Sequence, residues 1–169
     1  MFYDPHAFRF AEPLEAGWRA ILQEYRSVQD QLIDWFETEL YGEGWKVYGL
    51  FDFPHGRPLP ANIAQCPQTA ALVERHVPRH GAAGFSVLLP GTRIQPHRGY
   101  AGEFLRCHLG LSVPAGDCGL RVGSEIRMWQ EGKVMIFDDR DEHAAWNMAP
   151  EARVVLLVDF IAASGGARP

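Results

Sequence analysis

The second half of the chain is a succession of short apolar or alternating runs, each separated from the next by residues that favour turns. In chain order these runs are Phe85–Leu89, Phe104–Val113, Leu120–Val122, Glu125–Trp129, Lys133–Phe137 and Val154–Phe160. Turn signals such as Pro90-Gly91 and Pro114-Ala-Gly116 stand between them. Many short strands at this spacing are typical of a β-sandwich, a jelly roll or a barrel. The pattern therefore predicts a β core over residues 83–160.

The N-terminal part has a different period. Residues 12–40 carry apolar side chains at intervals of three and four, which places these side chains on one face of a helix. They are Leu14, Trp18, Ile21, Leu22, Tyr25, Val28, Leu32 and Phe36. We interpret the stripe as a packing face rather than a cofactor site. Ser27 can cap a second helix, which would divide the segment in two. Trp45–Phe51 is expected to be a strand, and Pro67–His76 a short helix with proline in its first turn.

The length of 169 residues fits one domain, so we expect a single domain over residues 1–169. Its predicted class is mainly β (α+β), with N-terminal helices packed on the β core. The tail, residues 164–169, is expected to lack a fixed structure. A formal net charge of −5 argues against nucleic-acid binding, because phosphates require a basic face. The expected partner is a small molecule or a peptide or protein substrate, and the pattern predicts no oligomeric state.

The cysteines and the apolar runs predict a cytoplasmic location. Cys66, Cys107 and Cys118 are odd in number and share no CxxC spacing, as expected of free thiols in a reducing compartment. Residues 1–10 contain no cationic segment followed by an apolar one, so no signal peptide is expected. The longest apolar run, Val154–Val158, is far too short to cross a bilayer.

The predicted strand 104–111 has two chemically different faces. Alternation places Leu105, Cys107, Leu109 and Leu111 on one face and Phe104, Arg106, His108 and Gly110 on the other. The first face is wholly apolar, whereas the second presents an arginine beside a histidine. An exposed polar face would look the same, but His97 lies only a few residues upstream. Arg106 and His108 are therefore candidate site residues.

A second candidate stretch follows the run Lys133–Phe137. Gly132, Asp138, His143 and Asn147 stand at intervals of six, five and four residues. This spacing resembles the second sequence motif of the cupins, jelly-roll barrels that hold a metal ion in their mouth. The alternative is that His143 is a surface residue paired with Asp141 or Glu142.

Arg153 directly precedes the apolar run Val154–Val158. An arginine at this position requires a partner for its charge, because an unpaired buried cation is costly. The partner is either a structural carboxylate such as Asp159 or a bound anion, since guanidinium groups bind carboxylates through two parallel hydrogen bonds.

Several of these motifs together resemble one enzyme family. They are His97-x-Gly99, Arg106-x-His108-Leu-Gly-Leu111, Trp129-x-Glu-Gly-Lys-Val-x-Ile-Phe-Asp-Asp139, Glu142-His143 and Arg153-x-x-x-x-Val-Asp159. In order and spacing they resemble the aspartyl/asparaginyl β-hydroxylases, which are Fe(II)- and 2-oxoglutarate-dependent dioxygenases on a double-stranded β-helix. The likeness covers roughly residues 84–160 and implies this fold, a jelly-roll of the cupin superfamily.

The resemblance also implies the roles of six residues. His97 and His143 match the two iron ligands. The residues that match those binding 2-oxoglutarate are Ser86 and Arg153 at its distal carboxylate, and Arg106 and His108 at the end that chelates iron. The implied reaction uses O2 to hydroxylate an unactivated C–H bond of an amino acid or a peptidyl residue.

Two positions depart from related patterns. Wider relatives carry a carboxylate ligand where this chain has Gly99, so water is expected at that metal position, with Asp138, Asp139 or Asp141 as alternatives. Phe104 replaces the arginine that family members use to hold an aspartyl substrate. The substrate-binding residues are therefore unknown, and asparagine, a free amino acid or an acyl chain stay open as substrates.

Two alternative functions remain at this point. One is a cupin-type metalloenzyme that does not use 2-oxoglutarate. Such an enzyme would have no need of two arginines, Arg106 and Arg153, that bind carboxylates. The other is a non-catalytic cupin-fold binding protein, which would have no need of both His97 and His143.

Overall fold

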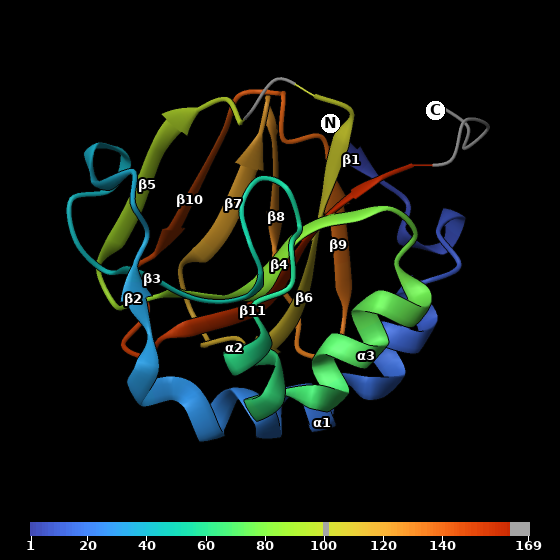
Figure 1. Cartoon of the computed structure of the whole chain (residues 1–169). Helices are drawn as coiled ribbons and strands as arrows, with labels where there is room; N and C mark the ends of the chain where they lie inside the picture. Colours follow the sequence, from blue (N-terminus) through green and yellow to red (C-terminus); the bar gives the residue numbers. More distant parts are fainter. Residues whose placement is uncertain (100–101, 163–169) are drawn as a thin grey trace.

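The computed structural model describes residues 1–99 and 102–162, and the strands among these residues form two antiparallel sheets (Figure 1). The seven-stranded sheet runs β1 (Phe2–Tyr3), β9 (Val134–Phe137), β6 (Phe104–Ser112), β11 (Arg153–Ile161), β4 (His80–Leu88), β3 (Trp45–Phe51) and β2 (Ile33–Asp34). The four-stranded sheet runs β5 (Thr92–His97), β10 (His143–Asn147), β7 (Cys118–Val122) and β8 (Glu125–Met128). Two facing sheets of this kind confirm the predicted double-stranded β-helix.

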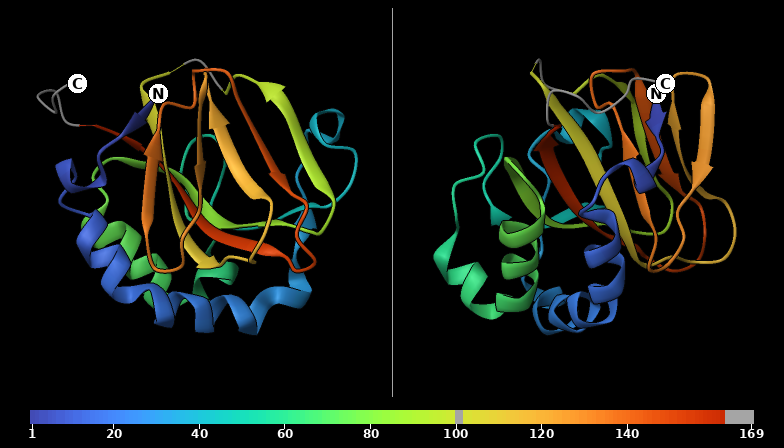
Figure 2. Two further views of the ribbon diagram at one scale, coloured as in Figure 1. Left: turned by 180° about the vertical axis from the view of Figure 1, so that it is seen from behind. Right: turned by 90° about the vertical axis from the view of Figure 1, so that its right-hand side faces the viewer.

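The helices cover the outer face of the larger sheet, and the smaller sheet covers its inner face (Figure 2). The helical elements are η1 (Pro5–Ala7), α1 (Ala11–Val28), η2 (Gln29–Gln31), η3 (Thr38–Leu40), α2 (Pro60–Gln65) and α3 (Pro67–His76). α1 buries Leu14, Ile21 and Val28 completely against the sheet. This face is the apolar stripe that the sequence predicted. No helix among the described residues is long and apolar enough to span a membrane.

Alternation along β6 separates the two cores. Leu105, Cys107 and Leu109 lie in the core beneath the helices, whereas Arg106 and His108 face the space between the sheets. The two-faced strand predicted from the sequence is therefore confirmed, and its polar face is buried rather than exposed. The three cysteines are buried free thiols, also as predicted.

The prediction of helix over residues 29–40 was wrong. α1 ends at Val28, and the Ser27 hydroxyl donates a hydrogen bond back to the Glu24 carbonyl instead of capping a second helix. Residues 29–40 form two short 3-10 helices and β2, which pairs with the edge of β3. Phe36 fitted the helical period but is 59% exposed. Tertiary contacts such as this strand pairing override a local helical period.

The sequence pattern did not identify β5 and β10. β5 is mostly polar and contains Pro96, and β10 begins at His143, which the sequence placed in a turn. The tail prediction for residues 164–169 lies outside the described residues.

Candidate functional site

A pocket with a cavity volume of about 30 Å³ opens between the two sheets. All six residues implied by the sequence line it. Ser86, Arg106, His108 and Arg153 come from the central strands of the larger sheet, and His97 and His143 come from the smaller one. The fold therefore brings these distant segments together, as the sequence predicted. Lining one pocket does not by itself assign a role to each residue.

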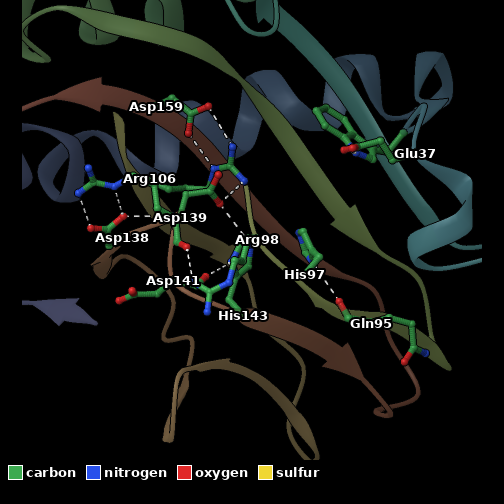
Figure 3. Close-up of polar contacts among 12 residues, drawn as sticks. Glu37, Gln95, His97, Arg98, Arg106, Asp138, Asp139, Asp141, His143 and Asp159 are labelled. Carbon is green, nitrogen blue, oxygen red and sulfur yellow. Dashed lines mark hydrogen bonds and ion pairs between the residues drawn. The ribbon is translucent and has the colours of Figure 1, made fainter. Parts of the chain in front are cut away.

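His97 and His143 lie directly opposite each other on β5 and β10. Their ring centroids are 4.2 Å apart. His97 Nδ1 is 2.8 Å from the Gln95 carbonyl and His143 Nδ1 is 2.9 Å from the Asp141 carbonyl (Figure 3). A carbonyl only accepts, so each Nδ1 carries the proton and each Nε2 keeps a lone pair. This is the tautomer in which a histidine binds a metal through Nε2.

His143 is neutral at physiological pH. Burial and the neighbouring His97 lower the pKa of His143 to about 3. Nor is His143 a surface residue paired with Asp141 or Glu142, which was the alternative from the sequence. It is buried, and its Nδ1 partner is a backbone carbonyl. Within the described ranges, no three His, Cys, Asp or Glu side chains are arranged to hold a metal ion. The chain itself therefore supplies a pair of histidines.

This depressed pKa predicts that the metal-free protein loses stability in mild acid. The unfolded chain takes up the His143 proton near pH 6.5, whereas the folded chain resists it down to about pH 3. The stabilising contribution is complete above pH 6.5 and declines as the pH falls toward 3. One pKa unit corresponds to about 1.4 kcal/mol, so we expect a loss of roughly 2 to 4 kcal/mol by pH 4.

Urea unfolding of metal-free protein at pH 7.5, 5.5 and 4.5 measures this loss. His143→Gln should flatten the decline, and His55→Gln, at an exposed loop position, should not. A decline of the same steepness in the wild type and in His143→Gln would contradict the assignment.

Asp139 occupies the space beside Gly99, where wider relatives place a ligand. Its Oδ1 lies 3.2 Å from His143 Nε2 and 2.7 Å from Arg106 Nη1. A Cβ on Gly99 would lie 1.6 Å from Asp139 Oδ2, which is an impossible overlap. The other two acids considered from the sequence are engaged elsewhere: Asp138 pairs with Arg140, and Asp141 with the Met1 amino group. Of these three acids, Asp139 is therefore the one that lies beside His143 and Gly99.

Arg106 is held from two sides by carboxylates (Figure 3). Its Nε and Nη2 donate to the two oxygens of Asp159 at 2.7 and 3.0 Å, and its Nη1 faces Asp139. Burial alone would lower the pKa of Arg106, but Asp139 and Asp159 raise it above the ordinary value, so the guanidinium stays charged. Asp159 is the partner of Arg106 and not of Arg153, which removes the structural alternative raised for Arg153.

Arg153 lies at the other end of the pocket with 1% of its surface exposed. Its Nη1 donates to the Ser86 carbonyl at 3.3 Å, and its guanidinium lies 4.5 Å from the centre of the Trp129 ring. Its Nε has no hydrogen-bond partner among the described residues, and none of the ion pairs found there includes it. Burial lowers the pKa of Arg153 to about 10, so it is still a cation at pH 7. A buried cation in this state requires an anion.

Two further hydrogen-bond donors in the pocket are also available to an anion. Trp129 Nε1 donates to His108 Nδ1 at 3.2 Å, so neutral His108 carries its proton on Nε2, which is buried and has no partner in the described structure. Burial and the nearby arginines keep the pKa of His108 well below its usual value. Trp45 Nε1 donates to Ser86 Oγ at 3.1 Å, which leaves the Ser86 hydroxyl proton available. These donors match a ligand with anionic oxygens at both ends.

Sequence reasoning missed the contributions of Asp159 and Trp129 to this geometry. Arg153 and Asp159 are six residues apart on one strand, so alternation alone places them on the same face. That signal was present in the sequence. The pairing of Asp159 with Arg106 is fixed by the register between β11 and β6 and was not readable from the chain.

Comparison with known proteins supports a family assignment. A family model described as aspartyl/asparaginyl beta-hydroxylase matches residues 15–163. An ornithine lipid ester-linked acyl 2-hydroxylase from Rhizobium tropici is 38% identical, over 94% of this chain and 59% of the relative. The aspartyl/asparaginyl beta-hydroxylase of Mus musculus is 36% identical, over 86% of this chain but only 20% of the relative. The chain thus spans only part of these relatives.

The solved structures agree on the fold. A prolyl-4-hydroxylase from Pseudomonas putida aligns with a TM-score of 0.58 at 15% identity, over 89% of this chain and 88% of that one. At this identity the alignment supports the double-stranded β-helix alone. The family model and the relatives above 30% identity go further, and the chain belongs to the aspartyl/asparaginyl β-hydroxylase family.

Proposed function

We propose that the protein is an Fe(II)- and 2-oxoglutarate-dependent dioxygenase that hydroxylates an unactivated C–H bond. The observation that carries the proposal is one pocket with two facing imidazoles at one end and, at the other, a guanidinium that has no ion pair among the described residues. Three buried polar atoms of the described residues have no hydrogen-bond partner. His108 Nε2 and Arg153 Nε are donors, for which a dicarboxylate supplies acceptors, and Asp139 Oδ1 is an acceptor that is ion-paired with Arg106. The residues present therefore fit the cofactor and the co-substrate.

The positions of these residues support the roles that the resemblance implied. His97 and His143 would hold Fe(II) through their Nε2 atoms. Arg153 and Ser86 would bind the distal carboxylate of 2-oxoglutarate, and His108 and Arg106 the end nearer the metal. Arg106 donates two of its five N–H groups to Asp159, and its Nη1 is ion-paired with Asp139, which leaves N–H groups for this contact.

With Fe(II) and 2-oxoglutarate bound, the site would convert R–H, O2 and 2-oxoglutarate into R–OH, succinate and CO2. The contribution of the protein is orientation and exclusion of water. Ile94, Leu120 and Phe137 give the pocket apolar walls, which keep solvent from the reacting atoms. Asp159 fixes the plane of the Arg106 guanidinium through two hydrogen bonds, and Trp129 fixes the His108 ring. Both side chains are thus held by other side chains of the chain, as a preorganised site requires.

Anaerobic addition of Fe(II) and 2-oxoglutarate tests the assignment. We expect a weak visible charge-transfer band, and succinate formation once air is admitted. His143→Ala should lose both signals, whereas Arg98→Ala should keep both, because Arg98 is an exposed arginine that donates to the Arg140 carbonyl. Absence of the band together with absence of succinate would leave the two alternatives: a cupin-type metalloenzyme without 2-oxoglutarate, or a non-catalytic binding protein.

The substrate class is a finer proposal. The sequence implied an amino acid or a peptidyl residue, and two relatives are named for aspartyl and asparaginyl hydroxylation. A second candidate is an acyl chain, as in the name of the Rhizobium tropici relative. Phe104 favours a substrate without a carboxylate at this position, because a phenyl ring cannot pair with one. We therefore propose that the reacting carbon belongs to an uncharged group.

A further inference from the structure

Strand β8 forms one edge of the four-stranded sheet, and no strand among the described residues pairs with its outer side. The two-residue turn Gly123-Ser124 joins it to β7 (Figure 1). The side chains that β8 turns away from the pocket are apolar: Ile126 is 56% exposed and Met128 is 46% exposed. An open edge with exposed apolar side chains is a template for pairing with another strand.

The other edges of the two sheets are protected against such pairing. β5, at the opposite edge of the same sheet, contains Pro96, which cannot donate a backbone hydrogen bond. β1 and β2, at the edges of the larger sheet, are two residues long each. Very short strands and prolines are devices that prevent edge pairing. β8 is four residues long and contains no proline, so it is the edge at which pairing is expected.

The backbone groups of Ile126 and Met128 point to the open side of β8. Only two residues separate Val122 from Glu125, so these residues form the hydrogen-bonded pair that closes the turn. Hydrogen-bonded and non-hydrogen-bonded pairs alternate along an antiparallel ladder, so Arg127 also bonds to β7, whereas Ile126 and Met128 do not. Among the described residues, no backbone hydrogen bond outside the strand ladders uses either of them. Their N–H and C=O groups are therefore available to a second strand.

The other side of β8 carries one acid and one base. Arg127 Nε donates to Glu125 Oε1 at 2.8 Å, and the Arg127 guanidinium lies 4.5 Å from the centre of the Phe2 ring. The two side chains are 41% and 51% exposed, so this ion pair lies open to solvent beside the free edge. Glu125 and Arg127 directly flank Ile126 in the strand. Opposite charges therefore stand at equal distances on either side of Ile126.

A second copy of β8 is complementary to this edge in an antiparallel register centred on Ile126. Glu125 then lies opposite the partner's Arg127, and Arg127 opposite the partner's Glu125, in the pairs whose side chains are closer together. Ile126 lies opposite the partner's Ile126, and the two exchange both of their backbone hydrogen bonds. A register centred on Arg127 would instead place arginine opposite arginine, which is destabilising. The charges of the strand thus favour its own copy as the partner, in one register.

We propose that the chain forms a two-fold symmetric dimer in which the β8 strands of two copies pair edge to edge. The contact is isologous, because each strand presents the same residues to the other. On the outer face, Met128 becomes a diagonal neighbour of the partner's Ile126, which covers apolar surface that is exposed in one copy. The proposal goes beyond the hydroxylase function and does not depend on it.

Sedimentation equilibrium of the full chain tests the dimer. The useful range is about 1 to 100 µM, because an interface of this modest size is expected to associate in the micromolar range. One chain has a mass of 19.0 kDa, and we expect the average mass to rise toward twice this value with concentration. Hydrogen exchange in residues 124–129 should slow over the same range, since the Ile126 N–H becomes bonded. A constant mass of one chain, or a dimer without slower exchange in this segment, would overturn the proposal.

Charge exchange in β8 tests the register. Arg127→Glu places acid opposite acid in both halves of the contact and should weaken dimerisation at least about tenfold. Adding Glu125→Arg restores opposite charges and should return the dissociation constant to within about threefold of the wild type. Arg93→Glu is the matched control, because Arg93 is an exposed arginine on β5 at the other edge of the same sheet. If Arg93→Glu weakened the dimer as much as Arg127→Glu does, or if the double variant did not recover, the proposed contact would be wrong.

Ile126→Pro tests the backbone contact. Proline removes an N–H that the β7 ladder does not use, and proline is tolerated at an edge strand whose N–H faces solvent. We therefore expect a folded monomer, with circular dichroism as the check on folding. A folded Ile126→Pro variant that still dimerises like the wild type would contradict edge pairing. Should this variant not fold, the recovery of the charge-exchanged double variant decides the question.

Discussion

Replacing Arg153 with methionine should weaken 2-oxoglutarate binding at least about thirtyfold. Arg153 is buried without a carboxylate partner, so its charge is available to the ligand. Removing one partner of a buried, hydrogen-bonded charge pair costs about 2 to 5 kcal/mol, and about 1.4 kcal/mol corresponds to tenfold in affinity. Titration of the anaerobic Fe(II) band with 2-oxoglutarate measures the dissociation constant directly.

Arg98→Ala is the matched control for this change. Arg98 is exposed and, among the described residues, donates only to the Arg140 carbonyl, so its loss should change the dissociation constant by less than about twofold. Equal effects of the two substitutions would mean that the dicarboxylate binds elsewhere.

Arg153→Met should not lose stability. A buried cation without an ion pair destabilises the ligand-free fold, and an apolar side chain of similar length removes that cost. We therefore expect Arg153→Met to unfold, without ligand, at a temperature equal to or above that of the wild type. This separates loss of binding from loss of folding, since a misfolded variant would unfold earlier.

Gly99→Ala should lower 2-oxoglutarate turnover by about a hundredfold or more. The added Cβ would lie 1.6 Å from Asp139 Oδ2 and 2.9 Å from the Asp139 backbone oxygen. Asp139 cannot swing aside freely, because Arg106 holds its carboxylate and the Gly99 N–H donates to its carbonyl at 2.8 Å. The substitution must therefore move groups that touch His143 and Arg106, and small displacements at a catalytic site have large effects on rate.

Gly102→Ala provides the comparison in the same segment of chain. A Cβ there meets only Phe104 Cδ2, at an ordinary 3.6 Å, so turnover should stay within about twofold of the wild type. The measurement is succinate formed per minute at saturating Fe(II) and 2-oxoglutarate. Unchanged turnover in Gly99→Ala would show that the position of Asp139 does not matter to the reaction.

The sequence by itself determined the β core and the chemistry of the site residues. Period-two alternation fixed which side of β6 carries Arg106 and His108, because successive side chains of a strand must point to opposite faces. The ordered motifs identified the family and with it His97, His143 and Arg153. These signals are local, or are carried by residue identity, and need no knowledge of the neighbouring strands.

Only the tertiary structure decided the partners of these groups. Residues 29–40 have a helical period in the sequence, but they include strand β2, because the edge of β3 was available to pair with this segment. Asp159 binds Arg106 and leaves Arg153 unpaired because strand register, set by packing across the whole sheet, places Asp159 opposite Arg106. Asp139 fills the space at Gly99 for the same reason. Contacts between segments distant in the chain are decided by the energy of the whole fold and not by the residues of either segment alone.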